Sequence, residues 1–140
     1  MSDEKLTAEQ IQAAFDASPF LAFLALRVVA LDHDAGTLTV LMPMRPELER
    51  RLGTGQIHGG PVAAFIDTVG DYAIGMALGG GVPTINLRVD YLRPAVGGSL
   101  TATARVRRAG RTVALVDVDV HDEKGSLVAV GRGTYSSQRG

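Results

Sequence analysis

The sequence predicts a single α+β domain, in which one antiparallel sheet of about five to six strands wraps round a long central helix. Two observations support this. Residues 58–78 are apolar on nearly every side, and residues 84–135 contain four runs in which apolar and polar side chains alternate. A helix that is apolar all round is buried, whereas period-two alternation is typical of strands with one face in water. A single sheet curled round one helix satisfies both patterns.

Length and composition agree with one soluble globular domain over residues 1–140, with residues 1–18 as an N-terminal helical extension. The chain is 46% hydrophobic and 21% charged, as is usual for such domains. A net charge of −1 gives no general attraction to nucleic acid or to an acidic membrane. The lack of cysteine excludes disulfides, a cysteine nucleophile and thiolate metal ligation. The polar N-terminal segment is unlike a signal peptide, so we expect a cytoplasmic protein.

The N-terminal third is expected to hold a short helix and a hairpin. Thr7 and Gln10 have the spacing of a capping box and predict a helix over residues 8–17, which Pro19 should end. Two β-prone runs, residues 22–31 and 37–42, flank a turn and predict a β-hairpin. A loop over residues 43–57, with one helical turn near residues 46–52, follows.

The long helix is expected to begin at Gly59-Gly60-Pro61 and to stop at three glycines, residues 79–81. Asp67 and Asp71 argue against a membrane span, since each carboxylate would cost roughly 3 kcal/mol at a bilayer centre. Four strands should follow, over residues 85–91, 101–107, 116–121 and 127–135.

Several site classes find no support in the sequence. Its three histidines, His33, His58 and His121, lack the spacing of metal ligands, and no serine lies in a GxSxG elbow. Six arginines fall between residues 88 and 111 against one acid, Asp90. This excess fits either a solvated sheet face or a site for a phosphorylated small ligand.

The start of the long helix combines with an acidic residue to give the main candidate site. Gly59 and Gly60 leave backbone N–H groups accessible at a helix N-terminus, which can hold an anion or an oxyanion. Asp67 follows two turns later in a helix expected to be buried, and Asp71 lies on the same face. Either the two carboxylates form a reactive pair with one raised pKa, or they cap loops and pair with arginines of the sheet.

Three segments carry a resemblance to a known family. HGGPVAAFIDTVGDYAIGMA, INLRVDYLRPAVGG and RRAGRTVALVDVDV resemble the PaaI-type hotdog-fold acyl-CoA thioesterases, over residues 36–136. The resemblance implies hydrolysis of an acyl-CoA thioester to an acid and coenzyme A. It makes Asp67 the nucleophile or general base and the Gly59 N–H the group that polarises the thioester carbonyl. In the family these two groups come from different subunits of a dimer.

The same resemblance assigns the remaining site residues. His58 and Gly60 would shape the turn, and Thr84, Asn86 and Tyr91 match positions that line the ligand channel. The coenzyme A segment matches Arg108, Gly110, Arg111 and Thr112. No metal and no cofactor are expected, since coenzyme A is part of the substrate and product. Asp71 is not among the family's usual site residues.

The resemblance also implies a homodimer with a continuous sheet, often paired into a homotetramer. The Val-rich segment 113–120 is the edge strand that we expect to make such a contact. Two other functions are compatible with the fold. One is a non-catalytic acyl-CoA or acyl-lipid binding module, and the other is a hydratase that would pair His58 with Asp67. Four side chains are predicted to pack in the core, although they would also be able to line a pocket for an aryl-acyl group: Phe23, Phe65, Tyr72 and Met76.

Overall fold

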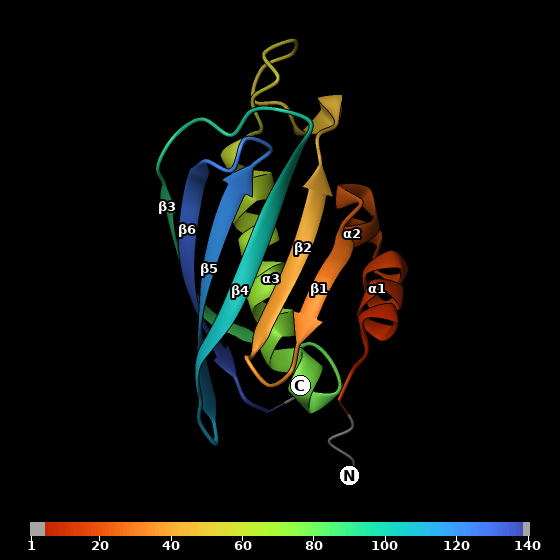
Figure 1. Cartoon of the computed structure of the whole chain (residues 1–140), viewed down its shortest axis with the longest axis vertical. Helices are drawn as coiled ribbons and strands as arrows, with labels where there is room; N and C mark the ends of the chain where they lie inside the picture. Colours follow the sequence, from red (N-terminus) through yellow and green to blue (C-terminus); the bar gives the residue numbers. More distant parts are fainter. Residues whose placement is uncertain (1–4, 139–140) are drawn as a thin grey trace.

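A computed structural model describes residues 5–138 and shows a curved sheet with one long helix packed against it (Figure 1). The helices and strands are, in chain order, α1 (Ala8–Ala17), α2 (Pro19–Leu24), β1 (Arg27–Asp32), β2 (Thr37–Pro43), the 3-10 turn η1 (Pro46–Leu48), α3 (Gly59–Leu78), β3 (Thr84–Tyr91), β4 (Ser99–Ala109), β5 (Val113–Asp122) and β6 (Leu127–Ser136). The predicted architecture, with its long helix and its short N-terminal helix, is confirmed.

The sheet has six strands in the order β1-β2-β4-β5-β6-β3, and every neighbouring pair is antiparallel. Its inner face packs on α3. Alternation supplies that face, as in β5, where Val116, Val118 and Val120 are buried and the side chains between them point outward. From α3 the core receives Val62, Phe65, Ile66 and Val69.

Both ends of α3 follow from local sequence. His58 is the N-cap, and its imidazole Nδ1 accepts a hydrogen bond from the Gly60 N–H at 2.9 Å. At the other end Gly79 has a φ of 91°, a left-handed conformation that glycine adopts readily. Gly79 and Gly80 then donate to the Gly75 carbonyl. The loop after α3 therefore folds back onto the last turn of the helix.

The structure corrects the reading of residues 18–31. The helix predicted over residues 8–17 is confirmed and ends before Pro19, but Pro19 then begins a second helix, α2, because proline suits the first position of a helix. Ser18 caps this helix by accepting the Leu21 N–H, so residues 22–24 are helical and the strand starts only at Arg27. The helical turn expected over residues 46–52 is limited to Pro46–Leu48.

The expected edge strand is also wrong. The Val-rich segment 113–120 lies in β5, between β4 and β6, because its buried valines need the centre of the sheet. The edges are β1 and β3. Exposed apolar side chains occur on both, including Val29 on β1 and Ile85 and Tyr91 on β3.

The long helix is not buried all round in one chain. The face of α3 toward the sheet is apolar, whereas Asp67, Thr68 and Asp71 are only half-buried on another face. By length and composition alone, Gly59–Leu78 is the one helix within residues 5–138 that would be able to cross a membrane. Here it is the core helix of the sheet.

Candidate active site

The carboxylate of Asp67 lies in the middle of α3, where a second element holds it. Thr84, the first residue of β3, donates its hydroxyl to Asp67 Oδ1 at 2.9 Å. This bond uses one carboxylate oxygen and fixes the direction of the other. Sequence resemblance had grouped these two residues, and the structure places them together.

Asp71, one helical turn later, binds the loop that leads into β3. Its Oδ1 accepts the Val82 N–H at 2.8 Å. Burial raises the pKa of Asp71 from 3.8 to about 6, the Val82 N–H acts against this, and the charge of Asp67 adds to the rise. Within residues 5–138 neither carboxylate forms an ion pair with a sheet arginine. The loop-capping interpretation is therefore correct for Asp71, and burial also raises its pKa.

Tyr135, on the sheet side of α3, contacts the turn that carries Asp67. It is fully buried on β6, and its hydroxyl donates to the backbone carbonyl of Asp67 at 3.1 Å. Gly70 makes room for the ring, since a Cβ there would lie 2.5 Å from the hydroxyl oxygen. Burial, together with the charges of the two aspartates, raises the pKa of Tyr135. Sequence alternation marked Tyr135 only as a strand residue, because its partner depends on how the helix sits on the sheet.

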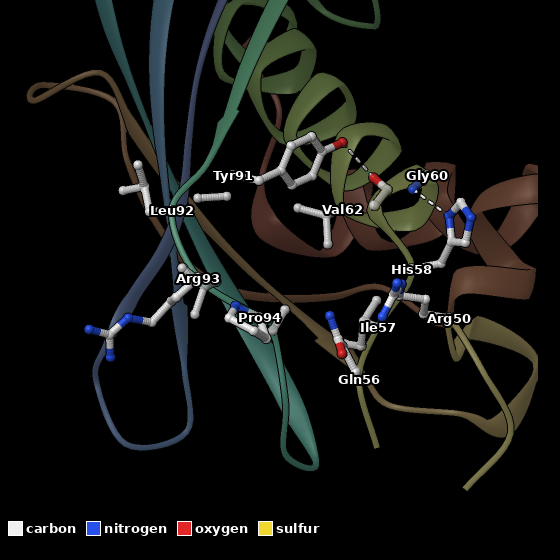
Figure 2. A pocket seen from close by; sticks show the side chains of 14 residues that line it. Arg50, Gln56, Ile57, His58, Gly60, Val62, Tyr91, Leu92, Arg93 and Pro94 are labelled. Carbon is white, nitrogen blue, oxygen red and sulfur yellow. Dashed lines mark hydrogen bonds between the residues drawn. The ribbon is translucent and has the colours of Figure 1, made fainter. Parts of the chain in front are cut away.

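A second cluster surrounds the N-terminus of α3. His58, Gly59, Gly60 and Tyr91 line a cavity of about 600 Å³, which Figure 2 shows from close by. Tyr91 donates its hydroxyl to the Gly59 carbonyl at 2.7 Å, so the ring lies over the first turn. The His58 imidazole accepts the Gly60 N–H. The Gly59 N–H belongs to the first turn, whose N–H groups have no acceptor within their own helix.

The cavity beside the helix N-terminus also receives polar groups that the site prediction did not include. Arg50, Gln56 and Arg93 line it. Arg93 belongs to the arginine excess between residues 88 and 111. Other members of that excess lie on the outer sheet face, where Arg107 and Arg88 pair with Asp117 and Asp90.

Asp67 and Gly59 do not meet in one chain. Asp67 lines a separate cavity of about 400 Å³ with Leu21, Thr68, Asp71, Tyr72, Gly81, Val82 and Pro83, none of which lines the Gly59 cavity. Eight residues along a helix correspond to about 12 Å. A carbonyl carbon under attack and its oxygen must both lie about 3 Å from their partners. One chain therefore supplies two separate halves of such a site.

The remaining predicted residues are dispersed. Asn86 is exposed on β3 and pairs with Thr134 of β6. Arg108 and Thr112 are exposed at the turn between β4 and β5. Gly110 and Arg111 line a third cavity of about 400 Å³, together with Ala77 and Leu78 at the C-terminal end of α3.

The four aromatic and methionine candidates also separate. Phe65 and Met76 are buried in the core. Tyr72 lines the Asp67 cavity, and Phe15 packs edge-on against its ring. Phe23 is 43% exposed, with the Arg45 guanidinium 4.5 Å above its ring centre. Tyr72 therefore faces the Asp67 cavity, and Met76 also lines the third cavity with Gly110 and Arg111.

Comparisons with known proteins agree with this arrangement. The model of the thioesterase superfamily matches residues 54–129, a segment that includes Gly59, Asp67 and Thr84. A Halobacterium salinarum protein provisionally named an esterase is 37% identical over 139 residues, covering 91% of this chain and 90% of its own. Human acyl-coenzyme A thioesterase 13 is 31% identical over 99 residues, covering 68% and 70%. The structure of Escherichia coli PaaI superposes with a TM-score of 0.74 at 26% identity, covering 92% of each chain.

The chain belongs to the thioesterase superfamily and has the hotdog fold of its PaaI-type members. Membership defines the class of chemistry as thioester hydrolysis.

Proposed function

We propose that this protein hydrolyses an acyl-CoA thioester to the free acid and coenzyme A, with Asp67 as the reactive carboxylate. The observation that carries the proposal is the Thr84–Asp67 hydrogen bond, which orients a half-buried carboxylate into a cavity. The human relative is named for acyl-coenzyme A hydrolysis, which supports this substrate class.

The chemistry needs two groups. The Gly59 N–H would polarise the thioester carbonyl and stabilise the negative charge that develops on its oxygen, aided by the helix dipole. Asp67 would accept a proton from a water molecule whose oxygen attacks the carbonyl carbon. The C–S bond then breaks, and coenzyme A leaves as the thiolate. Direct attack by Asp67, followed by hydrolysis of the resulting anhydride, gives the same two products, the free acid and coenzyme A.

A site of this kind requires two chains, since Gly59 and Asp67 of one chain are about 12 Å apart along α3. A two-fold axis beside α3 and perpendicular to it would make the two helices antiparallel. Asp67 of one chain would then approach Gly59 of its partner. The exposed edge strand β3, with Ile85 and Tyr91 each more than half exposed, supports a contact there. We therefore propose a homodimer, or a dimer of dimers, in the cytoplasm.

The same symmetry would bring the turn between β4 and β5 near the partner's Gly59 end. Arg108 and Arg111, exposed at that turn, would bind the phosphates of coenzyme A, with Gly110 and Thr112 shaping the contact. His58, Gly60 and Tyr91 would contact the substrate near its carbonyl. Asn86, on the exposed edge, would line the channel from β3.

The decisive experiment measures thiol release from aryl and fatty acyl-CoAs by the wild type and by Asp67→Asn. The substitution keeps the shape and removes the charge, so we expect kcat to fall by about a hundredfold or more with the fold intact. Asp117→Asn, on the outer sheet face, is the matched control and should keep its activity.

A folded Asp67→Asn variant with full activity would refute the assignment of Asp67. Coenzyme A binding by the wild type without hydrolysis of any thioester would instead favour the binding module.

A further inference from the structure

Asp71 lies in the candidate site, but it has no role in the reaction that the family resemblance implies. It lines the Asp67 cavity one turn further along α3, and its carboxylate accepts the Val82 N–H at 2.8 Å. Asp67 and Asp71 are four residues apart, so both side chains project from the same face of the helix. A second acid beside a catalytic carboxylate is electrostatically unfavourable, which calls for a specific role.

The hydrogen-bond partner of Asp71 is two residues from the hydrogen-bond partner of Asp67. Val82 is buried, and Pro83 follows it with its carbonyl accepting the Ser136 N–H at 2.9 Å. Thr84 comes next and donates its hydroxyl to Asp67. Each of residues 82–84 therefore makes a hydrogen bond to another element. Val82 and Thr84 bind Asp71 and Asp67 of α3, and Pro83 binds β6.

The loop before Val82 comes close to Asp71. A Cβ at Gly81 would lie 3.3 Å from Asp71 Oδ1, and Gly80 is hydrogen-bonded to the last turn of α3. Three consecutive glycines, residues 79–81, form this connection. Because glycine restricts the backbone least, such a loop needs an external anchor to hold Thr84 in one place.

We propose that Asp71 is a positioning residue, whose carboxylate anchors Val82 and thereby holds the Thr84 hydroxyl on Asp67. The inference rests on the proposed function, because it assigns Asp71 a role in the reaction carried by Asp67. It distinguishes this chain from a thioesterase in which the threonine is placed by the loop alone.

The electrostatic surroundings make the anchor sensitive to pH. Among the described residues, the titratable groups around Asp71 are Asp67 on the same helix, Tyr135 on β6 and the neighbouring Tyr72. The residues of the 79–83 loop and Leu21 of α2 carry no charge. Burial raises the pKa of Asp71 to about 6, so the anchor gains its charge as the pH rises through that value.

The kinetic test is a double-mutant cycle on acyl-CoA hydrolysis. Thr84→Val and Asp71→Ala should each lower kcat by about tenfold and change KM by less than about twofold, because a misplaced group harms the transition state. The double variant should be no slower than Thr84→Val alone, since Asp71 acts through Thr84. Asp119→Ala, exposed on the outer face of β5, is the control and should leave kcat unchanged.

Asp71→Asn separates the contact from the charge. Its amide oxygen can still accept the Val82 N–H, so kcat should lie between those of the wild type and Asp71→Ala. The wild-type kcat should rise as the pH passes about 6, and this step should be missing in Asp71→Asn. Full additivity in the cycle, or a wild-type kcat and pH profile in both Asp71 variants, would overturn the proposal.

A spectroscopic measurement keeps the proposal testable without turnover. In the wild-type protein the Val82 amide resonance should titrate with a midpoint near pH 6, and Asp71→Ala should shift the Thr84 resonances in a folded protein. If no acyl-CoA is hydrolysed, the proposed function fails while these shifts still report on the anchor. Unmoved Thr84 resonances in folded Asp71→Ala would refute the positioning role.

Discussion

The two faces of α3 differ in what they contact. Toward the sheet the helix presents Phe65, Ile66 and Val69, which have no exposed surface. Toward the Asp67 cavity it presents Asp67 and Asp71, half-buried and hydrogen-bonded to the strand and loop that follow. Burial of the apolar face stabilises the folded protein, because it removes apolar surface from water. The acidic face destabilises it slightly, because two carboxylates are held close together.

One rigid helix thus packs the core with one side and holds the candidate reactive groups on the other. A substitution on the sheet face should change the free energy of unfolding, whereas Asp67→Asn should change turnover. Three further substitutions test how complete that separation is.

Phe65→Ala should have the largest effect on stability. Deleting a fully buried phenyl ring removes its transfer energy and leaves a cavity, at a cost of about 3–5 kcal/mol. Denaturant unfolding measures this loss, while kcat per folded molecule, measured well below the melting temperature, should stay within about threefold of the wild type. A fall in kcat as large as that of Asp67→Asn would show that the two faces are not separable.

Tyr135→Phe should have a smaller effect on both properties, because Tyr135 reaches from the sheet to the Asp67 backbone. The variant loses one buried hydrogen bond, worth about 1 kcal/mol. We expect a lower melting temperature and a decrease in kcat much smaller than that of Asp67→Asn. A decrease as large as that of Asp67→Asn would make Tyr135 part of the catalytic group.

Asp71→Asn should change stability in the opposite direction, by an amount that depends on pH and disappears in acid. The folded pKa of Asp71, about 6, lies above its ordinary 3.8, so protonation favours the folded state. This contribution is complete below pH 3.8 and is lost as the pH rises through 6. The variant should therefore be more stable than the wild type at pH 7–8, on the order of 1 kcal/mol after solvent screening of this half-buried group, and match it near pH 3.

Asp117 gives the control of opposite sign for this experiment. The hydrogen bond from Arg132 lowers the pKa of Asp117, so its stabilisation is present at neutral pH and is lost as the pH falls. Asp117→Asn should thus be slightly less stable than the wild type at pH 7. If Asp71→Asn behaves in the same way, the burial argument for Asp71 is wrong.

Local patterns predicted most of the elements, since helical and strand periods are properties of short segments. The valines of β5 and the apolar face of α3 are examples. Residues 22–24 were wrongly predicted as strand, because an apolar run after proline is compatible with either a strand or the first turn of a helix. The position of segment 113–120 within the sheet was missed because strand order depends on contacts between distant segments.

The candidate site was predictable only in part. Asp67 and Gly59 stand out by sequence, and resemblance joined Thr84 to them. The contacts of Tyr135 with Asp67 and of Asp71 with Val82 depend on packing between α3, the sheet and the following loop. No spacing rule connects residues 68 positions apart, as Asp67 and Tyr135 are.

The separation of Gly59 from Asp67 along α3, about 12 Å, predicts that two inactive variants can complement each other. If each site draws one group from each subunit, two different inactive chains can restore activity to one another. Gly59→Pro removes the N–H at the first helix position, where proline suits the backbone and the Tyr91 ring, 3.3 Å from the new Cβ, must shift slightly. Asp67→Asn removes the carboxylate charge. A mixed dimer of these chains would concentrate both defects in one site and leave the other intact. Mixing the two inactive variants should then restore activity, because each active site would be formed by two chains together.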